Sequence, residues 1–162
     1  MHWRTRASRV AEVGSLKESP DGIDWQPWNP AAVAKARAAM RPVLVDFTAD
    51  NCLNCKFNKL TSLEIPSVRA KLKELNAVAL LADFSDGDPE IAAELRRYSR
   101  PGVPLVLVYP RDTNSPAIVL PAILTPGTVL AALEKAAGPK VNLGEIHSSE
   151  IKEPGLGKVS TP

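Results

Sequence analysis

The sequence predicts an α/β domain built on a central mixed β-sheet of about four strands, with helices on both faces. Short apolar runs of strand length alternate with segments whose apolar residues recur at helical spacing. The last two apolar runs are joined by a turn and predict a hairpin, which adds an antiparallel part to the sheet. With 162 residues, 44% of them hydrophobic, the chain is long enough for one domain with a hydrophobic core.

The first half of the domain is expected to begin with a helix, after which strands alternate with helices. Asn29, followed by Pro30, predicts the start of an alanine-rich helix that ends near Met40, ahead of Pro42. A strand over residues 43–47 and a helix over residues 52–60 are expected next. A shorter helix over residues 66–72 and a second strand over residues 77–84 follow.

The second half is expected to contain one more helix, the hairpin and a last helix. Asp88 caps the first of these helices, which turns Ile91, Leu95 and Tyr98 to one face. A loop over residues 100–104 then leads into a strand over residues 105–109. A turn over residues 110–116 joins it to a strand over residues 117–120. The last helix begins at Thr125 and ends near residue 137.

Composition divides the chain into a domain and two tails. Residues 1–22 and 139–162 are polar, with scattered glycine and proline, and we expect both segments to be flexible. The domain is predicted over residues 23–138. Trp25 and Trp28 are expected to pack its first segment onto the rest.

The bulk properties exclude several classes of protein. A formal net charge of +2 is too small to indicate a nucleic-acid or membrane-surface function. No apolar stretch approaches the roughly 18 to 20 residues that a transmembrane helix needs, and the first residues lack the apolar segment of a secretory signal. A cytoplasmic protein and a soluble piece of a larger exported or membrane-bound protein both remain open.

The only two cysteines, Cys52 and Cys55, stand directly behind the strand-like run. One helical turn would bring both sulfurs to the start of a helix, where the unpaired backbone N–H groups favour a thiolate at Cys52. Cys55 is then close enough to resolve a mixed disulfide. A zinc site is not expected, since it needs four ligands and His2 and His147 lie in the tails. The pattern therefore predicts a dithiol redox site.

Asp46 is the next candidate, because it interrupts an apolar strand between Val45 and Phe47. Burial would raise the pKa of its carboxyl toward neutrality, where the group can accept or donate a proton. Our hypothesis is that Asp46 lies beneath the dithiol and manages the proton of Cys55. The alternative is an exposed aspartate at a strand edge.

Two charged residues, Lys56 and Asp50, stand close to the cysteines and are candidates for changing the pKa of a thiol. Lys56 could lower the pKa of a thiol through its positive charge, or it could be an ordinary solvated helix residue. Asp50 would oppose a thiolate if it lay close, and it is expected on the surface.

Several separated motifs resemble the thioredoxin superfamily and, within it, the C-terminal periplasmic domain of the DsbD family of transmembrane disulfide reductases. The resemblance spans roughly residues 25–137. The matching motifs, in chain order, are WQPW at 25–28, VDFTADNCLNCK at 45–56, GVPL at 102–105, VYP at 108–110 and LPAILTP at 120–126.

The resemblance implies a thioredoxin-like fold and a role for each matching position. Cys52 would be the attacking thiol, Cys55 the resolving thiol and Asp46 the buried acid. Pro104 would follow a cis peptide bond, leaving the backbone of Val103 free to bind an extended substrate segment. The other positions expected to contact substrate flank the cysteines: Asn51, Leu53 and Asn54.

Two departures from the family pattern affect the expected site. Asn51 stands where the family usually has tryptophan, which removes apolar cover from the cysteines. Lys59 stands where some members have glutamate, so a second tuning acid is not expected here.

The expected function is reduction of partner-protein disulfides, without an external cofactor or metal. The expected partners are protein disulfide substrates and an upstream dithiol electron donor, such as a membrane reductase domain; no nucleic-acid partner is expected. A monomer in the periplasm or another extracytoplasmic compartment is expected, with the cytoplasm as the alternative. A disulfide donor or isomerase of the same fold, and a non-catalytic binding module, remain open.

Overall fold

The computed structural model describes residues 22–139. The tails predicted to be flexible lie outside these residues, apart from Gly22 and Pro139. A mixed sheet of five strands forms the centre, in the order β1-β3-β2-β4-β5. β1, β3 and β2 run parallel to one another, whereas β4 is antiparallel to both β2 and β5. The strands are β1 (Trp25–Pro27), β2 (Val43–Thr48), β3 (Val78–Asp83), β4 (Leu105–Tyr109) and β5 (Ile118–Val119).

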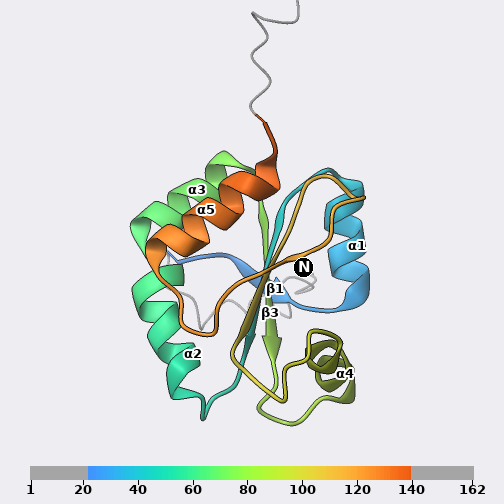
Figure 1. The fold of residues 1–162 in the computed structure, drawn as a ribbon, viewed down its shortest axis with the longest axis vertical. Helices are drawn as coiled ribbons and strands as arrows, with labels where there is room; N and C mark the ends of the chain where they lie inside the picture. The colour runs from blue at the N-terminus through green and yellow to red at the C-terminus, as the bar shows by residue number, and fades with distance from the viewer. Residues whose placement is uncertain (1–21, 140–162) are drawn as a thin grey trace, which may run out of the picture.

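Helices cover both faces of the sheet (Figure 1), with α2, α3 and α5 on one side and α1 and α4 on the other. A π-helical stretch, η2 (Lys59–Leu63), directly continues α2. The helices are α1 (Pro30–Ala38), α2 (Leu53–Asn58), α3 (Pro66–Glu74), α4 (Pro89–Arg97) and α5 (Pro126–Ala137).

Local sequence signals explain where most of these helices begin. Proline stands in the first turn of α1, α3, α4 and α5, where its missing N–H has no helical partner to lose. Asn29, Asp88 and Thr125 each accept a hydrogen bond from a backbone N–H of the turn that follows. The predicted helix starts at Asn29, Asp88 and Thr125 are therefore confirmed.

The hydrophobic core lies in two layers, one on each face of the sheet, and β2 contributes to both. Val43, Val45 and Phe47 pack with residues of α1 and α4. Leu44 packs on the opposite face, with residues of η2, α3 and α5. Since side chains alternate along a strand, Asp46 shares the face of Leu44.

The predicted mixed sheet with helices on both faces is confirmed, and the structure adds one strand. β1 is only three residues long and ends in a proline, so it has no alternating pattern to reveal it. It exists because Trp25–Pro27 pairs in parallel with Ala79–Leu81 at the sheet edge. Both tryptophans pack onto the domain as expected, Trp28 being buried and Trp25 lying against the opposite core layer.

Candidate active site

The cysteine pair lies where β2 ends and α2 begins. Cys52 is the N-cap residue of α2, and its sulfur accepts a hydrogen bond from the backbone N–H of Cys55 at 3.2 Å. The turn that delivers it is held at two points. The N–H of Cys52 bonds the carbonyl of Ala49 at 3.2 Å, and the N–H of Asp50 bonds the hydroxyl of Ser85 at 2.9 Å. The first cysteine therefore occupies a defined position at a helix start.

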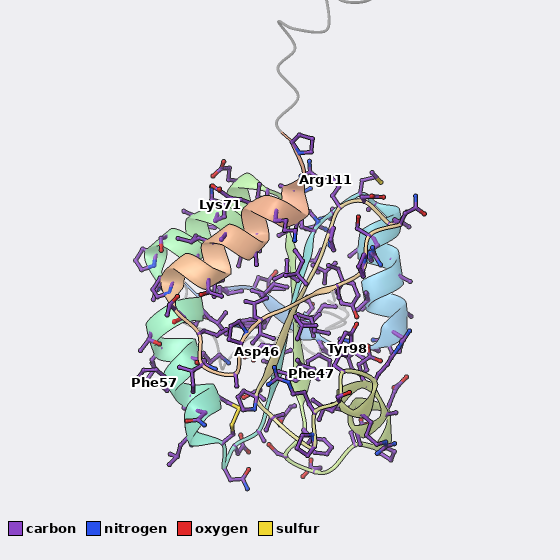
Figure 2. All side chains as sticks on the ribbon, viewed as in Figure 1. Asp46, Phe47, Phe57, Lys71, Tyr98 and Arg111 are labelled. Atoms are coloured by element: carbon purple, nitrogen blue, oxygen red, sulfur yellow. A yellow bond between two sulfur atoms is a disulfide. The ribbon has the colours of Figure 1, made fainter. Side chains whose placement is uncertain are left out.

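The two sulfurs form a disulfide, with the Cα atoms 5.2 Å apart. In Figure 2 the bond is visible beside the start of α2. The two cysteines differ in exposure: Cys55 is 2% exposed, whereas Cys52 is only half-buried. Of the two sulfurs, a partner protein could approach that of Cys52.

A second loop reaches the same edge of the sheet. The Val103–Pro104 peptide bond is cis, as the resemblance implied. Phe47 at the end of β2 pairs with Leu105 at the start of β4, and the two strands are antiparallel. Pro104 therefore stands beside the turn that leads to Cys52, and both Val103 and Pro104 are partly exposed.

Asp46 is buried within the sheet, with 2% of its surface exposed. Its pairing neighbours on β3 and β4 are both apolar, Leu81 and Val106. Burial away from water raises the pKa of the Asp46 carboxyl from 3.8 to about 7, against an opposing effect of the positive charge of Lys59. In Figure 2 Asp46 lies in the centre of the molecule. The predicted burial of Asp46 is confirmed, and the alternative of an exposed aspartate at a strand edge is wrong.

Lys59 and Trp25 form a contact that the sequence did not suggest. The ammonium nitrogen of Lys59, the first residue of η2, lies 5.4 Å from the centre of the Trp25 ring. The indole N–H of Trp25 in turn donates to Glu64 at 2.9 Å. A lysine one turn after a cysteine was a usable signal for a charge near the site, but nothing in the sequence indicated its aromatic partner.

Asn58 is a buried polar residue that sequence reasoning missed. Its side chain is 1% exposed, yet both ends of the amide are bonded to the loop before α5. The amide nitrogen donates to the carbonyl of Ala122 at 2.8 Å, and the amide oxygen accepts from the N–H of Leu124 at 2.9 Å. Asn58 thereby fastens that loop to the helix that contains Cys55. The available signal was its spacing, since it stands one turn after the buried cysteine.

The other predicted site residues lie on the surface around the cysteines. Leu53 is 80% exposed, although it is a large apolar side chain. The remaining three are also exposed: Asn51, Asn54 and Lys56. Their contacts with substrate, and an effect of Lys56 on the thiols, stay predictions. Asp50 is exposed, as expected.

Residues 22–139 contain no group of three or more His, Cys, Asp or Glu side chains placed to hold a metal ion. None of the helices in this part of the chain is both long and apolar enough to cross a membrane.

Comparison with known proteins gives consistent matches. A family model described as thioredoxin-like matches residues 24–110. The thiol:disulfide interchange protein DsbD of Ralstonia nicotianae is 33% identical over 107 residues, which are 66% of this chain and 17% of that protein. The chain thus spans less than a fifth of the curated relatives that it matches.

Solved structures show the same arrangement of strands and helices. The reduced C-terminal domain of DsbD from Neisseria meningitidis has a TM-score of 0.53 and 25% identity, covering 67% of this chain and 96% of that one. A thioredoxin from Thermus thermophilus has a TM-score of 0.57 and 24% identity, covering 80% of this chain and 98% of that one. The second likeness concerns the fold alone.

Proposed function

We propose that this chain, which belongs to the thioredoxin-like family and has the cysteine pair of a thiol–disulfide oxidoreductase, reduces the disulfides of partner proteins. One observation supports the proposal above the others. Cys52 and Cys55 are within bonding distance, but only Cys52 is accessible. An accessible attacking sulfur with a buried resolving sulfur behind it is the arrangement that two successive exchange steps require.

The first step is attack by the Cys52 thiolate on one sulfur of a substrate disulfide. A bond forms between Cys52 and that sulfur, the substrate S–S bond breaks, and the electron pair leaves on the other substrate sulfur, which takes up a proton. In the second step Cys55 attacks Cys52, which releases the first substrate sulfur as a thiolate. The substrate gains two electrons, and the protein is left with the Cys52–Cys55 disulfide.

Asp46 is proposed to accept the proton of Cys55 in the second step. A buried thiol must lose its proton before it can attack. Asp46 lies on the sheet face that η2 and its neighbours cover, and its pKa of about 7 lets it take a proton near neutral pH.

The oxidised protein then needs a dithiol donor to restore both thiols. The DsbD relatives support an upstream donor within a longer protein, such as a membrane reductase domain, and a periplasmic location. Protein disulfides are the proposed substrates, because the exposed surface around Cys52 and the Val103–Pro104 backbone could bind an extended segment.

The direction of electron flow is tested by measuring the reduction potential of the Cys52–Cys55 pair against glutathione. We expect a value well below about −180 mV, in the range of reductants of this fold. A value above that level would identify a disulfide donor instead.

Activity is tested with insulin as the disulfide substrate and dithiothreitol as the donor. Wild-type protein should accelerate insulin reduction. In a reaction without dithiothreitol, a Cys55→Ser variant should instead accumulate as a mixed disulfide with insulin through Cys52. A matched Cys52→Ser variant should form no such adduct, because its remaining thiol is buried. Equal adduct formation by both variants would contradict the assigned roles.

A further inference from the structure

We propose that Lys59 is a positioning residue for the proton step of this redox site, held against Trp25 so that its ammonium group favours the carboxylate form of Asp46. The inference rests on the proposed function, in which Asp46 receives the proton of Cys55. The positive charge of a lysine at position 59 favours the ionised form of Asp46, whereas the negative charge of a glutamate there would disfavour it.

The residues around Asp46 do little to stabilise the ionised form of its carboxyl. The residues paired with it on the two neighbouring strands are Leu81 and Val106, and Leu44 lies on the same face of its own strand. One carboxyl oxygen, Oδ2, is buried and has no hydrogen-bond partner. Burial disfavours the ionised form of such a carboxyl, and a positive charge close by favours it.

Lys59 begins η2, which packs on the same side of the sheet as Asp46. Burial raises the pKa of the Asp46 carboxyl, and the positive charge of Lys59 opposes this effect. The flanking strands contribute the apolar side chains named above. The balance between burial and the lysine sets the protonation of Asp46 near pH 7.

A set of contacts keeps the ammonium group of Lys59 in place without neutralising it. The face of Trp25 receives the cation at 5.4 Å, an attraction to the ring that leaves the positive charge intact. The ring is itself fixed by its 2.9 Å hydrogen bond to Glu64. No ion pair joins Lys59 to an acidic side chain within residues 22–139.

Glu64 is occupied by other partners, which explains why it does not capture the lysine. Its two carboxylate oxygens accept from the N–H of Ile23 at 3.2 and 3.1 Å. One of them also lies 3.6 Å from the guanidinium of Arg69. Lys59 is also held by its place in the backbone, because it is the first residue of the wide π-helical turn that links α2 to Glu64.

The chemical consequence concerns the resolving step. Asp46 must be a carboxylate to accept the proton when the Cys55 S–H bond breaks and its sulfur attacks Cys52. Burial alone would keep Asp46 protonated at neutral pH, and the lysine restores a fraction of the ionised form. The proton passes to the Asp46 carboxyl, and the electron pair remains on the Cys55 sulfur for the attack.

The test compares Lys59→Met with two controls. Lys73→Met removes the charge of an exposed lysine on α3, on the same side of the sheet. Lys59→Arg keeps the charge at position 59. The first measurement is the titration of the Asp46 carboxyl carbon by NMR in the oxidised protein of residues 1–162. It needs no turnover, so its outcome is independent of whether the protein is a reductase.

We expect the Asp46 midpoint to move to higher pH in Lys59→Met and to stay near the wild-type value in both controls. In the insulin assay, Lys59→Met should lose about three- to tenfold in rate at pH 7 and recover toward the wild-type rate as the pH rises. A midpoint in Lys59→Met equal to that in Lys73→Met would overturn the proposal. A shifted midpoint without any insulin reduction by wild-type protein would instead contradict the proposed function alone.

Discussion

The two faces of strand β2 differ in kind, although neighbouring residues of one short segment build both. The face toward α1 and α4 presents Val43, Val45 and Phe47, all of them fully buried. The face toward η2, α3 and α5 presents Leu44 and then Asp46. A single step along the strand therefore separates an apolar packing surface from a buried titratable group.

This difference indicates a division between stability and chemistry. Trp28 packs on Phe47 with ring centroids 5.4 Å apart, on the face that holds no cysteine. The opposite face has the buried Asp46 carboxyl, the Asn58 amide at the end of α2 and the Lys59 cation at the start of η2. Substitutions on the first face should change the free energy of unfolding, and substitutions on the second should mainly change reactivity.

The largest effect is expected on the chemical side, from Cys52→Ser. Loss of the accessible sulfur removes the nucleophile, so insulin reduction should fall at least about a thousandfold. Thermal unfolding of this variant, compared with the reduced wild-type protein, should show a fold that is still intact. A variant that kept a tenth of the activity would place the attacking sulfur elsewhere.

Phe47→Ala tests the packing side. Removal of a fully buried ring should lower the free energy of unfolding by about 3 to 5 kcal/mol, measured by urea denaturation. Under conditions where the variant is still folded, the reduction potential of the cysteine pair should match wild type. An altered potential without a loss of stability would show that the two faces are not separate.

Asp46→Asn should change both the free energy of unfolding and the rate of disulfide reduction. The Asp46 carboxyl has a higher pKa in the folded protein (about 7) than its ordinary value of 3.8, so the folded state binds more protons between these pH values. The contribution of Asp46 to wild-type stability should therefore be greatest below about pH 4, fall as the pH rises to about 7, and level off above it. The asparagine variant cannot ionise, so it should lack this loss.

Relative to wild type, Asp46→Asn should gain up to about 4 kcal/mol in the free energy of unfolding between pH 4 and pH 8. Its insulin reduction at pH 7 should fall about tenfold or more, because the proton acceptor is gone. Urea denaturation across the pH range measures the gain in the free energy of unfolding. Parallel pH dependence in the two proteins would show that Asp46 does not titrate as a buried group.

The smallest effect is expected from Asn58→Ala, which removes the two hydrogen bonds to the loop before α5. It leaves the carbonyl of Ala122 and the N–H of Leu124 without these partners, at a cost of about 1 to 3 kcal/mol in the free energy of unfolding. The exposed Asn54→Ala is the matched stability control and should change unfolding by less than about 0.5 kcal/mol. Equal unfolding curves for the two variants would contradict a fastening role for Asn58.

Many site features were predictable because they depend on residues close in the chain. The cysteine spacing, the strand before it and the helix start at Cys52 are local, and the structure has all three. Asp46 was recognisable as a polar residue inside an apolar run, and its burial follows from that run lying at the centre of the sheet. The cis bond before Pro104 came from the family resemblance rather than from its local sequence.

What the chain determined by itself was the order of its strands and helices, the helix starts and the pair of thiols, since capping, periodicity and spacing act between near neighbours. Tertiary structure alone decided that Trp25 would join the sheet edge and receive Lys59, and that Asn58 would fasten a loop more than sixty residues away. These contacts arise only when distant segments pack together, because burial and charge depend on the whole fold rather than on adjacent residues.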